Sequence, residues 1–247
     1  MSVERLQNSQ AIEVWAVPLV PPGNGIAEYL SCLSNEERLR AGRFHFDQHR
    51  QDFILSHASL RLLLGGYLSV PPHRIRFSFG RNGKPRLADE MECPVQFNMA
   101  HSGDFAVYAF CVGCEVGIDV ERIRDMPDLL DIARRFFSEA ECVDLVEFPV
   151  EQRGRAFFTC WTRKEAYIKA RGDGLSLALD SFRVEFDSTA PRIFEPPEAT
   201  TENGWNLANL EVDSACLAAL AYPGARRSIT LHPALSPAVL IERAQRS

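Results

Sequence analysis

The chain has 247 residues, 46% of them hydrophobic and 24% charged, which is typical of a globular protein that buries a substantial core and excludes a disordered one. Its net charge of −6 argues against nucleic acid as a partner, because binding a phosphate backbone needs a basic face. The polar N-terminus and the short, interrupted apolar run after it indicate neither a signal peptide nor a membrane span. Seven scattered cysteines fit a reducing cytoplasm, where we expect the protein to reside.

The first part of the chain is expected to form one strand and two helices. Residues 13–17 alternate between apolar and polar positions like a strand. Ser34 and Glu37 have the spacing of a capping box, so a helix should begin there. Asp47 is the expected N-cap of a longer helix through Ser69, which has apolar residues at helical spacing.

The one clearly basic stretch of this acidic chain lies around the start of the long helix. Its cations are Arg38, Arg40, Arg43 and Arg50, with His45 and His49 between them. A solvated helix face explains such a stretch as well as a phosphate clamp or a dock for an acidic partner helix does.

A period of two then predicts strands, separated by turn residues. The expected strands are 75–79, 95–100, 105–110 and 114–120. Cys111 and Cys114 have the spacing of half a zinc site, but no second pair stands at that spacing. Val112-Gly113 is typical of a hairpin turn, so we expect neither a metal site nor a redox role there.

The last part of the chain begins with helices and ends with strands. A short helix over 128–137 precedes a second capping box at Ser138 and Glu141. A long helix follows over 151–170 and stops at Gly172. Strands are expected over 182–186, 205–212 and 216–222, around a turn-rich stretch over 188–204, and the tail from 233 to 247 should add one or two helical turns at most.

A faint internal repeat suggests two related halves. The pattern of residues 75–79 recurs at 182–186, and in each half a strand pair follows. An α+β fold of two similar lobes related by a pseudo-twofold, each a small antiparallel sheet packed with a long helix, would explain this repeat, which is too degenerate to establish that fold by itself. The expected lobes are residues 1–114 and 115–247.

Candidate metal ligands gather on two of these elements. Asp119 and Glu121 alternate with apolar residues and so point to the same face of a strand. Glu165 and Lys169 lie one turn apart on one edge of the long helix. Carboxylate oxygens of this kind suit Mg²⁺ together with a substrate phosphate. A solvated strand end and a surface ion pair explain the same spacing without any metal.

Four ordered blocks between Gly83 and Gly174 resemble those of the phosphopantetheinyl transferases. They are Gly83-Lys84-Pro85, residues 97–104 (FNMAHSGD), residues 117–121 (GIDVE) and residues 161–169 (WTRKEAYIK). The chain length resembles the Sfp-type members, in which one polypeptide holds both lobes, so the resemblance implies a monomer rather than a trimer of half-length chains. The family usually has Ser where this chain has Ala100.

The resemblance also implies roles for individual residues. Asp119, Glu121 and Glu165 would bind Mg²⁺, with Glu165 or a metal-bound water as the base and Lys169 neutralising a diphosphate. Lys164 is a weaker candidate for the same diphosphate contact. The nucleotide end of coenzyme A would be held by Arg43, Arg50, Lys84, His101 and Ser102, and Trp161 is expected to pack rather than to bind.

The implied reaction moves the phosphopantetheine arm of coenzyme A to a serine of an acyl or peptidyl carrier protein and releases adenosine 3′,5′-bisphosphate. Such carriers serve fatty acid, polyketide or nonribosomal peptide biosynthesis, and the exposed arginines near Arg38 and Arg40 would guide their docking. A Mg²⁺-dependent phosphohydrolase or nuclease would also use three carboxylates. A non-catalytic carrier-binding module is the third alternative.

Overall fold

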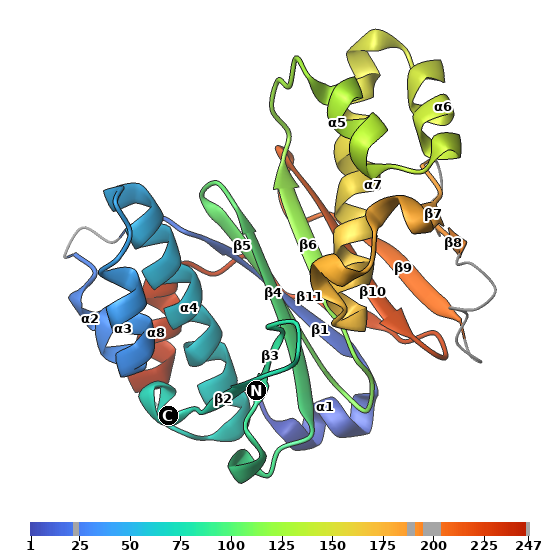
Figure 1. Cartoon of the computed structure of the whole chain (residues 1–247). Coiled ribbons are helices and arrows are strands. Elements are labelled where there is room, and N and C mark those ends of the chain that lie inside the picture. The colour runs from blue at the N-terminus through green and yellow to red at the C-terminus, as the bar shows by residue number, and fades with distance from the viewer. Residues whose placement is uncertain (22–24, 187–190, 195–203, 246–247) are drawn as a thin grey trace.

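Three apolar cores separate four layers in the order helices, sheet, sheet, helices (Figure 1). The structure is a computed structural model that describes residues 1–21, 25–186, 191–194 and 204–245. The middle core lies between the two sheets and is built from small and β-branched residues such as Val14, Val107, Ile118 and Ala218. The predicted fold class, two α+β lobes that each pack a sheet against a long helix, is confirmed.

The first lobe pairs a four-stranded sheet with the long helix α4. Its elements are α1 (Val3–Ser9), β1 (Ile12–Pro18), α2 (Ala27–Cys32), α3 (Asn35–Ala41), α4 (Asp47–Leu68), β2 (Phe77–Phe79), β3 (Pro85–Leu87), β4 (Val95–Ser102) and β5 (Phe105–Val112). The capping box at Ser34 and Glu37 is present as predicted. The N-cap of α4 is Phe46 rather than Asp47, and it makes no side-chain cap hydrogen bond.

The second lobe repeats this plan with a three-stranded sheet and the long helix α7. Its elements are β6 (Gly117–Arg122), α5 (Leu129–Phe136), α6 (Glu139–Glu147), α7 (Val150–Arg171), β7 (Arg183–Val184), β8 (Ile193–Phe194), β9 (Trp205–Leu210) and β10 (Cys216–Pro223). The second capping box, at Ser138 and Glu141, is also present. The predicted strand 182–186 is only two residues long, and most of the turn-rich stretch 188–204 lies outside the described residues.

The C-terminal segment crosses back to the first lobe. Strand β11 (Ile229–Leu231) pairs in parallel with β1 at the edge of the first sheet, whose strand order is β11-β1-β5-β4. The prediction of an antiparallel sheet is therefore wrong for this one pair of strands. Helix α8 (Pro237–Gln245) packs against α4 (Figure 1). The lobe boundary expected at 114/115 stays a prediction, and β11 and α8, which follow it in the chain, pack with elements of the first lobe.

The turn at residues 111–114 joins the two lobes and is not a hairpin. Strand β5 pairs with β1 and β4, whereas β6 pairs with β10 in the other sheet. The sulfurs of Cys111 and Cys114 lie 3.6 Å apart as free thiols. In the described part of the chain no helix is both long and apolar enough to cross a membrane.

Candidate active site

Strand β6 and helix α7 touch where the predicted ligands begin. A Cβ atom at Gly117 would overlap the backbone of Ala166 and Ala170, so only glycine allows this close approach. Residues at alternate positions of β6 share a face, which directs Asp119 and Glu121 toward the same side of the sheet as Gly117. The local sequence thus brings both carboxylates up to the helix that carries Glu165 and Lys169.

Asp119 is a buried carboxylate with one satisfied oxygen. Its side chain is 8% exposed, and its Oδ1 accepts a hydrogen bond from Lys169 Nζ at 2.6 Å. Its Oδ2 is buried and has no hydrogen-bond partner. Burial raises the pKa of Asp119 to about 7, the Lys169 ammonium opposes that rise, and the carboxylates of Glu165 and Glu121 add to it. A second cation at this carboxylate would satisfy the orphaned oxygen.

Glu121 is held by residues of both lobes. Its Oε2 accepts hydrogen bonds from Ser102 Oγ at 2.8 Å and from the Arg124 guanidinium at 3.2 Å. Ser102 Oγ also accepts from the backbone N–H of Arg122. The Ser102 hydroxyl therefore orients a carboxylate of β6, and its assignment to the nucleotide stays a prediction.

Glu165 and Lys169 line a cavity of about 550 Å³ at the seam between the lobes. Other lining residues are Asn82, Gly83, Lys84, Pro85, Asn98, Met99, Arg135, Phe136 and several residues between Gly172 and Asp180. Burial raises the pKa of Glu165. The nearby positive charge of Lys169 opposes this rise, and the negative charge of Glu121 adds to it. Trp161 packs on the aromatic rings of Phe136 and Phe157, as expected.

The carboxylates suit a divalent cation by their chemistry but are not yet gathered around one point. Hard oxygen donors, an orphaned Asp119 Oδ2 and mutual repulsion all favour a positive ion between them. However, among the residues that the structure describes, no three His, Cys, Asp or Glu side chains are close enough to hold one ion. The Lys169 ammonium supplies the positive charge beside Asp119, so the three metal ligands stay a prediction.

Lys164 is a structural residue, contrary to its assignment as a weaker coenzyme contact. Its side chain is fully buried, and its ammonium pairs with Glu141 at 2.8 Å. It also donates hydrogen bonds to the backbone carbonyls of Leu179 and Phe182. Neighbouring residues on a helix point in directions about 100° apart, which turns Lys164 into the core while Glu165 faces the cavity.

The ammonium of Lys84 is also engaged by the protein itself. It donates to Glu115 Oε2 at 2.7 Å, to the carbonyl of Val116 at 3.1 Å and to the carbonyl of Ala170 at 3.0 Å. An ammonium has three donors, so these contacts occupy all of them. The assignment of Lys84 to the coenzyme phosphates stays a prediction, and a phosphate contact would require the ammonium to give up one of these three partners.

The remaining predicted residues lie on the first lobe, near the basic stretch. Arg43 and Arg50 are exposed, and Arg50 pairs with Asp47 at 3.0 Å. Desolvation lowers the pKa of His101, Asp52 and Glu121 oppose this, and Lys169 adds to it. His101 is thus within electrostatic reach of both α4 and the Lys169 end of the cavity. Among the described residues that line the cavity, neither Arg43 nor Arg50 is present.

Sequence reasoning missed Asn98 and Glu115. Asn98 Oδ1 accepts from the backbone N–H of Ile118 at 2.9 Å and so ties β4 to β6 beside the cavity. A buried asparagine inside an apolar strand was the available signal, because such a side chain needs a partner. Ala100 is buried in the core between the sheets, so the position where the family resemblance implies a serine presents no hydroxyl in this chain.

Comparison with known proteins assigns both lobes to one family. Residues 115–220 match the family profile described as 4′-phosphopantetheinyl transferase superfamily. Residues 20–112 match the profile described as 4′-phosphopantetheinyl transferase, N-terminal. Together the two matches cover most of the chain.

Individual relatives agree with the profiles. The chain is 37% identical to the 4′-phosphopantetheinyl transferase HetI of Nostoc sp., over 87% of this chain and 89% of that one. It is 33% identical to the 4′-phosphopantetheinyl transferase Sfp of Bacillus subtilis, over 69% and 74%. A solved structure, the holo-[acyl-carrier-protein] synthase of Thermotoga maritima, is 21% identical with a TM-score of 0.37 over 45% of this chain and 64% of that one.

Proposed function

Since this chain belongs to the 4′-phosphopantetheinyl transferase superfamily, as an Sfp-type transferase, we propose that it moves the phosphopantetheine arm of coenzyme A to a serine of an acyl or peptidyl carrier protein. Adenosine 3′,5′-bisphosphate would be the second product. The proposal includes a dependence on Mg²⁺ and a single chain as the working unit.

One observation carries the proposal at the level of the site. A buried carboxylate with a free oxygen, Asp119, lies beside Glu121, Glu165 and a lysine, at the edge of a cavity between the lobes. Catalysis of phosphoryl transfer is mainly positioning and charge neutralisation, so carboxylates and cations are the groups it needs. No nucleophilic side chain is required, since the acceptor serine belongs to the carrier.

Lys169 is proposed to neutralise the diphosphate of the coenzyme. Its side chain is 30% exposed, so the ammonium can exchange Asp119 Oδ1 for a phosphate oxygen without unfolding α7. That exchange would leave both oxygens of Asp119 available, together with Glu121 and Glu165, to hold the ion. A bound Mg²⁺ would supply charge neutralisation at the diphosphate of the coenzyme.

Glu165 is proposed to take the proton of the incoming serine hydroxyl. Burial raises its pKa, which makes its carboxylate a better proton acceptor than an exposed one at neutral pH. The helix places Glu165 and Lys169 one turn apart on the same edge, so the base and the phosphate-binding cation face one cavity.

The test is an incubation of apo carrier protein with this protein, coenzyme A and Mg²⁺, followed by intact mass spectrometry. We expect the carrier to gain the mass of one phosphopantetheine arm, with an equal amount of adenosine 3′,5′-bisphosphate released. A carrier with its acceptor serine replaced by alanine is the matched control. Phosphate release without carrier modification would favour the phosphohydrolase, and binding of the carrier without any product would favour the non-catalytic module.

A further inference from the structure

The turn between β2 and β3 in the first lobe reaches across the seam to the C-terminal end of helix α7 in the second lobe. Lys84 closes this turn, where its carbonyl accepts from the N–H of Gly80 at 2.9 Å. Its side chain is only 8% exposed. Asn82 of the same turn donates to the carbonyl of Gly172 at 3.0 Å. Two side chains of one lobe therefore bind backbone carbonyls at the C-terminus of α7.

These contacts satisfy groups that a helix leaves open. The last four carbonyls of an α-helix have no partner within it, and the helix dipole places partial negative charge there. The Lys84 ammonium donates to Ala170 in the last turn of α7 and lies at this negative end. A buried cation at this position stabilises the end of α7 that carries Lys169.

The same ammonium reaches the start of β6. Val116, whose carbonyl it binds, directly precedes Gly117, where β6 and α7 come closest. Glu115 completes the set, and Arg86 pairs with the other oxygen of Glu115 at 2.9 Å. Lys84 thus bridges the strand that carries Asp119 and Glu121 to the helix that carries Glu165 and Lys169.

We propose that Lys84, held by Glu115, is a positioning residue that fixes the spacing between β6 and α7, and that it does not bind the coenzyme phosphates. The inference rests on the proposed function for the identity of the site. A displacement of about 1 Å between reacting groups costs about 10²-fold in rate, so a loosened helix end should slow turnover rather than weaken substrate binding.

The experiment compares Lys84→Met, Glu115→Gln and the double variant, each as the full chain. We expect Lys84→Met to lower kcat about 10- to 100-fold, with the Kd for coenzyme A unchanged within about threefold. Glu115→Gln should lower kcat in the same direction by less, and the double variant should resemble Lys84→Met because both act through one contact. Assays are run well below the unfolding temperature of each variant.

Two results would overturn the proposal. If Lys84 instead bound a phosphate of coenzyme A, Lys84→Met would weaken coenzyme A binding about tenfold or more. Glu115→Gln would then leave that binding intact, or strengthen it by releasing the lysine. A purely stabilising contact predicts a lower unfolding temperature with kcat unchanged. Asp131→Asn, which removes an exposed ion pair with Arg134, is the control for a loss of surface charge.

Hydrogen exchange separates this proposal from the proposed function. In Lys84→Met and Glu115→Gln we expect faster amide exchange over residues 168–172, at the end of α7, than in the unsubstituted protein. This readout needs no turnover, so it stands even if the unsubstituted protein fails to modify any carrier. Unchanged exchange there would refute the positioning role by itself.

Discussion

The two long helices, α4 and α7, show what the lobes share and where they differ. Each has 22 residues, and each ends at a residue with left-handed backbone, Ser69 (φ 56°) in one and Gly172 (φ 75°) in the other. A cation occupies the same position counted from the first residue of each helix, Arg61 in α4 and Lys164 in α7. Both side chains are almost fully buried.

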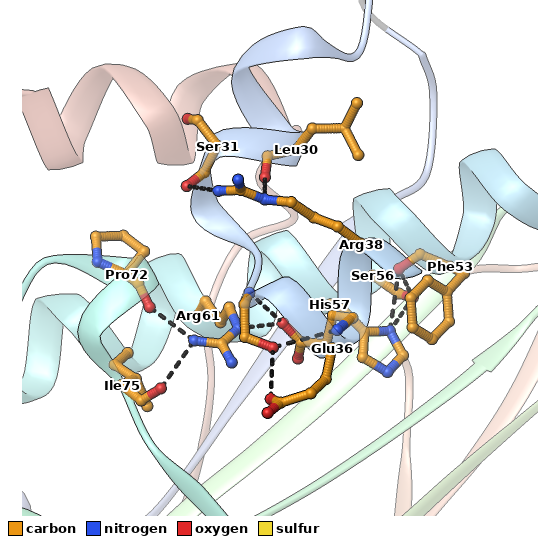
Figure 2. A network of polar contacts seen from close by, with 12 residues as sticks. Leu30, Ser31, Glu36, Arg38, Phe53, Ser56, His57, Arg61, Pro72 and Ile75 are labelled. Atoms are coloured by element: carbon orange, nitrogen blue, oxygen red, sulfur yellow. Dashed lines mark hydrogen bonds and ion pairs between the residues drawn. The ribbon is translucent and has the colours of Figure 1, made fainter. Parts of the chain in front are cut away.

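The partners of these two cations also correspond. Each cation pairs with the glutamate of a capping box, Arg61 with Glu37 at 2.6 Å and Lys164 with Glu141 at 2.8 Å. Each then donates to two backbone carbonyls beyond its own helix: Pro72 and Ile75 for the first, shown in Figure 2, and Leu179 and Phe182 for the second. The buried ion pair is therefore part of a scaffold that occurs twice.

The difference lies on the neighbouring edge of the helix. Glu165 and Lys169 line the cavity in α7, whereas the matching positions of α4 are Leu62, which is buried, and Gly66, against which Met1 packs. The buried cation is common to both helices, whereas the carboxylate and the cation that line the cavity are on α7 and not at the matching positions of α4. We therefore expect loss of the buried cation to lower stability in either lobe, and loss of Glu165 or Lys169 to lower activity.

The largest effect should come from Glu165→Gln, which removes the proposed base but keeps the size of the side chain. Loss of general base catalysis costs about 10²–10⁴-fold, and we expect a drop in kcat of about 10³-fold with an unchanged unfolding temperature. Steady-state transfer of the arm to apo carrier measures it. Asp119→Ala and Glu121→Ala, which each remove a proposed metal ligand, should lower transfer to a similar extent.

The control for this prediction is Asp131→Asn, because the Asp131 side chain is exposed, pairs with the exposed Arg134 and is not among the described residues that line the cavity. It should keep full activity. Unimpaired transfer by Glu165→Gln would place the base elsewhere and remove the functional contrast between α4 and α7.

Breaking the shared scaffold is the second prediction, with Lys164→Met and Arg61→Met as a matched pair. Removing one partner of a buried ion pair costs about 3–5 kcal/mol, since the other charge stays buried and unpaired. We expect a loss in this range for Lys164→Met, whose partner Glu141 is fully buried, and a smaller loss for Arg61→Met, because Glu37 is 14% exposed and can be rehydrated. Denaturant-induced unfolding measures both.

A different outcome would restore the sequence-based role of Lys164. If Lys164→Met kept its stability and instead raised the KM for coenzyme A, the lysine would contact substrate. Adding Glu141→Gln to Lys164→Met should recover part of the lost stability, because it removes the unpaired charge.

Local signals in the sequence predicted much of this scaffold. Both capping boxes placed the starts of α3 and α6 correctly, because a cap involves only residues three positions apart. The glycine at 172 ended α7 for an equally local reason. The alternation through 116–121 also placed Asp119 and Glu121 correctly on the face of β6 that meets α7.

Long-range contacts explain what the sequence did not reveal. Lys84 binds Ala170 and Lys164 binds Glu141, and neither partner can be inferred from spacing along one element. The turn after β5 was misread as a hairpin because its two strands enter different sheets. Family motifs marked these lysines as important, but only packing shows that their ammonium groups are held by carboxylates and backbone carbonyls of the protein.

The buried carboxylate of Asp119 should lower the stability of the second lobe at neutral and alkaline pH, which is the third prediction. Burial raises the pKa of Asp119 from 3.8 to about 7 in the folded state, so the folded protein holds this proton more tightly than the unfolded chain. The stability that this adds is present below pH 3.8 and is lost as the pH rises toward 7. Asp119→Asn, which cannot ionise, should therefore be more stable than the unsubstituted protein at pH 8, on the order of 2–4 kcal/mol.

Unfolding measured from pH 4 to pH 8 tests this sign. The two proteins should converge near pH 4, where Asp119 is largely protonated, and separate as the pH rises. If Asp119→Asn were the less stable protein at pH 8, the ion pair with Lys169 would outweigh the burial of the charge, and the site would stabilise the lobe.

The smallest effect is expected from Lys169→Ala, which tests whether the ammonium on this edge of α7 binds the phosphates of the coenzyme. Loss of a partly exposed charge contact to phosphate should raise the KM for coenzyme A about tenfold, with a smaller change in kcat. Lys169→Arg keeps the charge and should recover most of the affinity, which separates charge from packing. Because Lys169 also partners Asp119, its removal leaves that carboxylate without its nearest cation, so the KM of Lys169→Ala should depend more steeply on Mg²⁺ concentration than that of the unsubstituted protein. Equal Mg²⁺ dependence in the two proteins would mean that the lysine and the ion do not share Asp119, and that α7 differs from α4 in charge alone.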